Sequence, residues 1–191
     1  MRKFVLLTVL VLLATTSVSA NTITVTPTPV ISGSNPYSWA YDVTLDGDSQ
    51  INPGDFFTIF DFDGLVLGSQ SANAGWTASS SAVGACPTDF GFPVLCAAAD
   101  DPAIPNLTWT RTGSVIVSTG GVVPLGVFSA QSIYNIPRND FFVSQDQDNQ
   151  LNSPNEGAGG GTNVPSVPEP ASLLLLGSGL ALIARRKMVK K

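Results

Sequence analysis

The sequence has no histidine among its 191 residues, and it has only two cysteines and two methionines. Histidine is the side chain that most often serves as a general base and as a metal ligand. Its absence excludes Ser-His-Asp and Cys-His nucleophilic sites. Paired carboxylates can hydrolyse glycosides, and two pairs occur, Asp61 with Asp63 and Asp100 with Asp101. Because Pro102 follows the second pair, we interpret that pair as a turn. With no histidine and no convincing carboxylate pair, we expect the protein not to be an enzyme.

Basic side chains are scarce in the middle of the chain. Residues 21–167 contain 13 acidic residues and only two basic ones, Arg111 and Arg138, which gives a net charge of −11. Nucleic-acid binding needs basic patches that neutralise phosphate groups, so this composition excludes a nucleic-acid partner. Strong acidity favours solubility and a weak attraction for divalent cations.

The N-terminus has the features of a secretory signal peptide. Arg2 and Lys3 precede a mostly apolar stretch over residues 4–14, and small residues follow as far as Ala20. A basic region, a short apolar region and a small-residue cleavage site are typical of such signals. A membrane span needs about 20 apolar residues, so the stretch is too short to be an anchor. We expect a secretion translocon and a signal peptidase as partners, with residues 1–20 removed.

The C-terminus combines a short motif, an apolar segment and a basic tail. Residues 167–170 read Val-Pro-Glu-Pro, residues 171–184 are uncharged and mostly apolar, and five basic residues follow. At about 1.5 Å per residue, a helix over residues 171–184 reaches about 21 Å, whereas the hydrocarbon core of a membrane is about 30 Å thick. Positive charge beside an apolar segment stays in the cytoplasm. These features predict a marginal transmembrane helix that serves as a processing signal.

This order of motif, apolar helix and terminal basic cluster resembles the PEP-CTERM sorting signal. The matching residues are Val167, Pro168, Glu169 and Pro170 in the motif and Arg185, Arg186 and Lys187 in the basic stop. The resemblance implies export by a Gram-negative bacterium that makes exopolysaccharide. It also implies processing by an exosortase, a membrane-embedded cysteine protease or transpeptidase. An ordinary short C-terminal anchor is the alternative interpretation of residues 167–191.

Between the two ends, the residue pattern predicts an all-β fold. Gly, Pro, Ser, Thr and Asn interrupt short stretches of β-branched and aromatic residues every eight to twelve positions, which is typical of a β-sandwich or barrel. The clearest strand, Tyr37–Leu45, places its aromatic and aliphatic residues on one face. Residues 55–62 are apolar on both faces and predict a central, buried strand. We expect one β-sandwich-like ectodomain over residues 21–143, with a jelly roll or an immunoglobulin-like sandwich as alternatives.

The remaining strands are expected at shorter patterns of the same kind. They are predicted near Gly75–Ser81, Asn106–Thr112, Ser114–Ser118, Leu125–Ala130 and Phe141–Val143. Residues 144–166 lack an apolar cluster and contain three consecutive glycines, so we interpret them as a flexible linker. Several stretches, including Gly54–Phe62 and Leu125–Ser132, also resemble a recurring type of PEP-CTERM ectodomain that has no assigned biochemical role.

Residues 46–55 are similar to a calcium-binding loop of the EF-hand or dockerin kind, in which oxygen ligands alternate around a sharp turn. The candidate ligands are Asp46, Asp48, Asn52 and Asp55. Two departures weaken the match, because the first ligand position falls on Thr44 and Ser49 stands where such a loop has glycine. We therefore favour a polar turn between two strands and expect no cofactor, with weak calcium binding as the alternative.

Aromatic side chains can bind carbohydrate by stacking against a sugar ring, and Trp39, Trp76 and Trp109 are candidates by type. Trp39 lies on the apolar face of its predicted strand, so we expect it in the core. Trp76 lies among glycine and serine residues and is the best candidate for an exposed stacking platform. Asn106 begins a glycosylation sequon, which carries little weight because it lies within a predicted strand.

The two cysteines, Cys86 and Cys96, are predicted to form a disulfide. A signal peptide directs them to an oxidising compartment, where two unpaired thiols would be unusual. Neither a Cys-x-x-Cys pattern nor a histidine points to a redox or metal site. The segment between them contains two prolines and a glycine, so we interpret it as a loop held by the bond. Two free, buried cysteines are the alternative.

The sequence as a whole predicts an exported protein with a structural or interaction role at the cell surface or in a polysaccharide matrix. We expect transient anchoring in the inner membrane, followed by processing and release to the cell surface or the extracellular space. A carbohydrate-binding module that recognises an exopolysaccharide is the alternative function.

Overall fold

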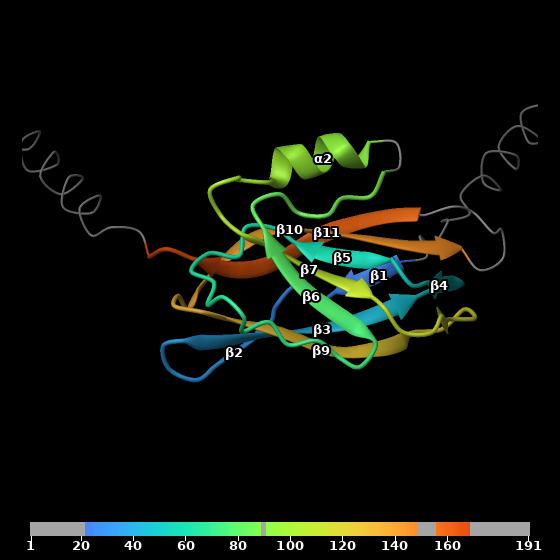
Figure 1. Ribbon diagram of the computed structural model, residues 1–191, viewed down its shortest axis with the longest axis horizontal. Helices are drawn as coiled ribbons and strands as arrows, with labels where there is room; N and C mark the ends of the chain where they lie inside the picture. Colours follow the sequence, from blue (N-terminus) through green and yellow to red (C-terminus); the bar gives the residue numbers. More distant parts are fainter. Residues whose placement is uncertain (1–21, 89–90, 149–155, 169–191) are drawn as a thin grey trace, which may run out of the picture.

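The computed structural model describes residues 22–88, 91–148 and 156–168. They form two antiparallel sheets packed as a sandwich, with one short helix, α2, above the second sheet (Figure 1). This arrangement confirms the predicted all-β, sandwich-like fold. The predicted signal peptide, residues 1–20, and the predicted C-terminal helix, residues 171–184, lie outside the described residues. Within the described ranges, no helix is long and apolar enough to cross a membrane.

β3 (Tyr37–Asp46) is the centre of the first sheet. Along one edge it pairs with β9 (Val123–Ser132), and along the other with β1 (Thr22–Val25) and β2 (Val30–Ser32). Alternate side chains of β3 point into the sandwich, as the period of two predicts. The buried ones are Trp39, Tyr41, Val43 and Leu45.

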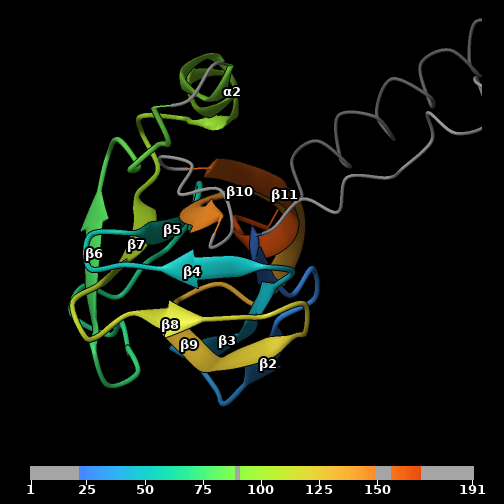
Figure 2. The ribbon, with the colours of Figure 1, turned by 90° about the vertical axis from the view of Figure 1, so that its right-hand side faces the viewer.

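The second sheet has seven strands, six of which follow one another across the sheet. In spatial order these are β6 (Trp76–Ser81), β7 (Asn106–Arg111), β5 (Phe56–Ile59), β10 (Ile136–Asp148), β4 (Ser49–Ile51) and β8 (Ile116–Val117). The seventh, β11 (Glu156–Ser166), pairs with β10. All four residues of β5 are buried, which confirms the predicted central strand. Figure 2 shows α2 beyond β10 and β11, on the side away from β3 and β9.

Aromatic rings fill the space between the sheets. Phe57 of β5 stacks on Trp109 of β7 with ring centroids 5.1 Å apart, and Phe128 of β9 meets Phe57 edge-on at 5.0 Å. The indole N–H of Trp109 donates to the Ser71 carbonyl oxygen at 3.0 Å. Because Phe128 belongs to the first sheet and Phe57 and Trp109 to the second, these contacts join the two sheets.

The prediction of a flexible linker is wrong for residues 144–148 and 156–166, the parts of the range 144–166 that the structure describes. β10 continues to Asp148, and β11 pairs with it from Asp146↔Glu156 to Ile136↔Ser166. The glycines form part of this strand because neighbouring rings occupy the space that side chains would fill. A Cβ at Gly159 would lie 2.6 Å from Phe141 Cζ, and a Cβ at Gly160 would lie 2.9 Å from Phe142 Cε1. The run of glycines, which suggested a flexible linker, is therefore part of a strand whose backbone is covered by aromatic side chains of the neighbouring strand.

β11 is also tied to the first sheet. The Asn163 N–H donates to the Pro27 carbonyl oxygen at 2.8 Å, and the Asn163 carbonyl oxygen accepts from the Tyr41 hydroxyl at 3.1 Å. The Thr162 hydroxyl donates to the Thr26 carbonyl oxygen at 2.9 Å. These bonds link the two sheets at one side of the sandwich, so the ectodomain extends to Ser166 rather than ending at residue 143.

Helix α2 (Phe92–Ala99) replaces the second half of the predicted loop between the cysteines. Gly91 precedes it with φ 95°, and Pro93 lies in its first turn, a position that suits proline because the N–H there has no partner within the helix. Cys96 is its buried residue, whereas Val94 and Leu95 are exposed. The helix has no apolar stripe, and a periodic pattern therefore could not reveal it.

The predicted disulfide between Cys86 and Cys96 is confirmed. It attaches α2 to the segment that follows β6. Cys96 packs against Phe60 and Val143 in a small apolar cluster outside the main core. The bond therefore supports an element that buries little surface of its own.

Candidate functional site

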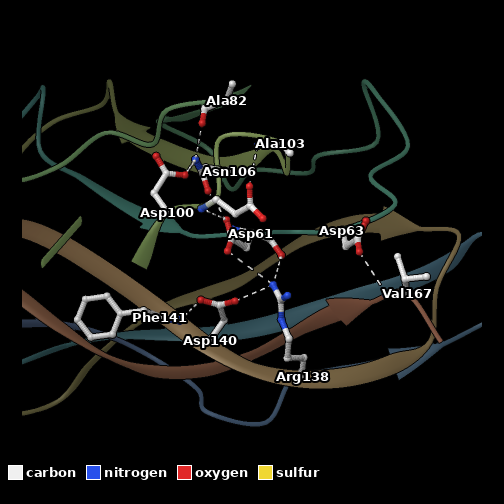
Figure 3. Close-up of polar contacts among 11 residues, drawn as sticks. Asp61, Asp63, Ala82, Asp100, Ala103, Asn106, Arg138, Asp140, Phe141 and Val167 are labelled. Carbon is white, nitrogen blue, oxygen red and sulfur yellow. Dashed lines mark hydrogen bonds and ion pairs between the residues drawn. The ribbon is translucent and has the colours of Figure 1, made fainter. Parts of the chain in front are cut away.

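Asp61, which closely follows β5, is the centre of a polar cluster (Figure 3). It lines a groove together with residues of α2. Its backbone has φ 51°, in the left-handed region that Asp tolerates better than most residues. Its N–H donates to Asn106 Oδ1 at 2.8 Å, and its Oδ1 accepts the Asp101 N–H at 2.9 Å. The side chain is 8% exposed. The hydrogen bond from Asp101 and burial orient the carboxylate, and the hydrogen bond to Asn106 holds the backbone beneath it.

Arg138 of β10 joins this carboxylate to a second one. Its Nη2 lies 2.8 Å from Asp140 Oδ2 and 3.7 Å from Asp61 Oδ2. Burial raises the pKa of both carboxyls above their usual range, because the charged form loses hydration, and the guanidinium acts in the opposite direction. The Arg138 side chain is 40% exposed, so one face of this triad is open to solvent.

The triad lines an open groove of about 700 Å³, which we call the α2 groove. Its lining residues come from the end of β5, from β10 and β11 and from the helix: Asp61, Leu95, Ala98, Ala99, Arg138, Asn139, Asp140, Phe141 and Gly161. The groove offers carboxylate oxygens, guanidinium and amide N–H groups, and one partly exposed ring. Such a surface can hydrogen-bond to hydroxyl groups and stack against a flat apolar face.

Asn106 and the aspartates near it serve structural roles. Asn106 is fully buried, and its Nδ2 donates to Asp100 Oδ1 at 2.8 Å and to the Ala82 carbonyl oxygen at 3.3 Å. The sequon therefore does not present an accessible amide. Asp101 Oδ1 accepts the Ala103 N–H at 3.0 Å, which agrees with the interpretation of Asp100 and Asp101 as a turn.

A second groove, of about 710 Å³, lies where the chain leaves the sandwich, and we call it the exit groove. It is lined by Asp63, Ile136, Pro137, Arg138, Ser166 and Val167. The Val167 N–H donates to Asp63 Oδ2 at 3.2 Å (Figure 3). Asp61 and Asp63, paired in the sequence, thus line different grooves. Val167 and Pro168 are the described part of the predicted sorting motif, while Glu169, Pro170, Arg185, Arg186 and Lys187 lie outside the described residues.

The prediction that Trp76 is an exposed stacking platform is wrong. Trp76 is 7% exposed, and its ring meets Phe57 at 5.8 Å and Phe128 at 5.3 Å between ring centroids. The guanidinium carbon of Arg111 lies 5.7 Å from the centre of the ring. Trp76 is the first residue of β6, so the glycine and serine around it belong to a turn and to a strand whose other face is exposed.

Among the candidate calcium ligands, Asp46 belongs to one hydrogen-bond network, and Asn52 and Asp55 belong to another. Asp46 Oδ2 accepts from the Thr24 hydroxyl at 2.9 Å. Asp55 Oδ2 accepts the Asn52 N–H at 2.6 Å, and burial raises the pKa of the Asp55 carboxyl. Asp48 lies in the turn between β3 and β4. Across residues 22–88, 91–148 and 156–168, no three acidic or cysteine side chains are grouped so that they could hold a metal ion.

Sequence reasoning did not anticipate the Asp61–Arg138–Asp140 triad. Asp61 and Arg138 are 77 residues apart, and no local pattern connects them. One signal was available, because Arg138 is one of only two basic residues in a strongly acidic segment. A lone cation in such surroundings is expected to pair with carboxylates.

Residues 166–188 match the family model of the PEP-CTERM protein-sorting motif. The matched segment begins at the last residue of β11 and includes the Val-Pro-Glu-Pro motif and the residues Arg185, Arg186 and Lys187, which confirms the resemblance inferred from the sequence. This motif is the recognition signal of an exosortase-type sorting system, and its presence supports export of the chain and sorting by such a system. No curated protein and no solved structure matches the chain.

Proposed function

We propose that this PEP-CTERM protein is a structural or interaction protein of the cell surface or of the surrounding polysaccharide matrix. The observation that supports the proposal best is the sorting motif at residues 166–188, joined directly to the last strand of a folded sandwich. The sandwich is then the exported domain, and the residues after it are its sorting signal.

Export and processing of the chain follow a defined order. The secretion translocon exports the chain, a signal peptidase removes residues 1–20, and the apolar segment at residues 171–184 holds the chain in the inner membrane for a short time. An exosortase then removes the tail and sets the sandwich free to reach the surface or the matrix.

The proposal assigns the sandwich no catalytic role and no cofactor. Asp61 and Asp140 share the Arg138 guanidinium, an arrangement suited to holding the end of β5 against β10. For calcium, isothermal titration calorimetry should detect no site tighter than about 10⁻⁴ M, the weak end of the range for calcium-binding modules. A micromolar site lost in Asp48→Ala would contradict this assignment.

The sorting step is tested by replacing the basic stop. Changing Arg185, Arg186 and Lys187 together to Ser removes three of the five charges that keep the tail in the cytoplasm. In an exosortase-containing host, the variant should be released from the membrane without being processed, whereas the wild-type chain should be processed. Normal processing of the variant would contradict the proposed role of the tail. The matched control is Leu67→Ser, which changes an exposed side chain of the sandwich and leaves the charge of the tail unchanged.

The alternative function, a carbohydrate-binding module, now depends on the α2 groove instead of Trp76. The groove combines hydrogen-bonding groups with the Phe141 ring, which is the chemistry that neutral sugars need. Binding to a glycan array that is lost in Asn139→Ala and in Phe141→Ala, but retained in the exposed-site control Leu67→Ala, would favour the module. Absence of binding by the wild-type protein to exopolysaccharide from its own host would favour the structural role.

A further inference from the structure

The sandwich leaves no spacer in front of the sorting motif. Ser166 pairs with Ile136 as the last residue of β11, and its hydroxyl donates to the Ile136 carbonyl oxygen at 3.2 Å. The motif begins at the next residue, and residues 167–170 alone separate the sheet from the apolar segment. Because an extended chain spans at most about 3.5 Å per residue, these four residues reach about 14 Å. An enzyme that acts on the motif must therefore bind it close to the surface of the folded domain.

The first residue of the motif also takes part in the hydrogen bonds of the fold. The Val167 N–H donates to Asp63 Oδ2, across 104 residues of sequence. The backbone of Asp63 is itself held in place, because its carbonyl oxygen accepts from the Ser132 hydroxyl at 2.6 Å. The side chain of Asp63 thus connects the motif to the end of the sandwich, beside Pro137 and Arg138 in the exit groove.

We propose that the folded domain holds the start of the sorting motif at Asp63, and that the processing enzyme must displace this contact before it binds the motif. The inference rests on the proposed function, since it assumes that an exosortase processes the tail. Enzymes that bind extended peptides do so largely through main-chain hydrogen bonds. The Val167 N–H is already used by Asp63, so only the fraction of molecules with Val167 released is ready to bind. The apparent affinity of the enzyme falls by that fraction.

Removal of the hydrogen bond between Val167 and Asp63 should speed processing. In a host that contains an exosortase, pulse-labelled full-length Asp63→Ala should lose its tail about three to ten times faster than wild type, the factor expected for one hydrogen bond. Asp63→Asn keeps an acceptor oxygen and should stay close to the wild-type rate. The matched control is Asp42→Ala, which removes an exposed carboxylate from β3 and should process like wild type.

A second variant tests the same contact without changing Asp63. Six Gly and Ser residues inserted between Ser166 and Val167 should detach the motif from the sandwich and accelerate processing by a similar factor. In this background, Asp63→Ala should have no further effect. Processing at the wild-type rate in both Asp63→Ala and the insertion would overturn the proposal, as would slower processing in either one.

Amide hydrogen exchange gives a measurement that does not depend on the enzyme. In the detergent-solubilised full-length chain, the Val167 amide should exchange faster in Asp63→Ala than in wild type, while the amides of β10 and β11 keep their protection. Equal exchange at Val167 would overturn the contact itself. The proposed function fails separately, if a chain with Pro168→Ala and Pro170→Ala is still processed normally. Loss of processing in that chain, together with a wild-type rate in Asp63→Ala, defeats this inference alone.

Discussion

Gly160 of β11 is paired with Phe142 of β10, and the Phe142 ring occupies the space in which a Cβ of residue 160 would lie, at 2.9 Å from that position. Phe142 is 6% exposed and belongs to the main core. The ring therefore has little freedom to move aside, and the glycine at this position is required by packing. This pair shows most directly that the glycine-rich segment is part of the folded domain.

We expect Gly160→Val to lower the free energy of unfolding by about 1–3 kcal/mol, because it overpacks the space filled by Phe142. Urea denaturation followed by tryptophan fluorescence measures the change. The control is Gly121→Val, where a Cβ meets no atom within 4 Å, and its denaturation midpoint should stay close to wild type. Equal midpoints for both variants would mean that β11 does not contribute to stability.

Removal of the disulfide should destabilise the protein through the unfolded state. The bond joins residues 10 positions apart, and closing a loop of this size contributes about 3 kcal/mol in the chain-entropy account. Cys86→Ser should therefore lower the Tm by several degrees, since each kcal/mol shifts it by about 2–8 °C. Denatured, unreduced protein should show almost no free thiol in a thiol titration, and two thiols per chain would contradict the bond.

Trp76→Ala should act on stability. Because the ring is buried between Phe57 and Phe128, its removal should cost about 3–5 kcal/mol. Leu67→Ala, at a side chain that is 81% exposed, should change the denaturation midpoint very little. A Trp76→Ala variant with unchanged stability would contradict the buried position.

The protein should become more stable as the pH is lowered from neutral to about 4.5. Burial raises the pKa of Asp55, Asp61 and Asp140, so the folded state binds these protons more tightly than the unfolded chain does. The free energy of unfolding therefore falls as the pH rises from about 4 through the raised pKa values of these carboxyls in the folded state. Denaturation midpoints measured between about pH 4.5 and 7 check the direction. Asp61→Asn should flatten the profile, and a midpoint that increases toward pH 7 would contradict the account.

The parts of the fold that the sequence reveals are the strands whose own side chains are apolar on one face or on both. β3 alternates between aromatic or aliphatic residues and small or polar ones, and β5 is apolar on both faces. A strand with one buried face or two therefore carries its own signal in the chain. β11 carries no such signal, because its packing surface is supplied by Phe141 and Phe142 of the neighbouring strand.

The candidate site was hidden for a related reason. Asp61, Arg138 and Asp140 meet only because β5 and β10 are neighbours in the second sheet. Trp76 was misjudged because its neighbours in sequence are small and polar, while its neighbours in space are Phe57 and Phe128. The sorting motif, by contrast, is a linear signal read by an enzyme, so it could be recognised from the order of its residues alone.

The intact mass of the protein recovered from the cell surface or the medium tests the central claim most directly. If the sandwich is the exported domain and the C-terminus is its sorting signal, the mature protein should lack residues 1–20 and everything from about Pro170 onward. Its mass should then fit a chain that ends within a few residues of Ser166, with Cys86 and Cys96 oxidised. A mature protein that still contains residues 171–191 would contradict the account.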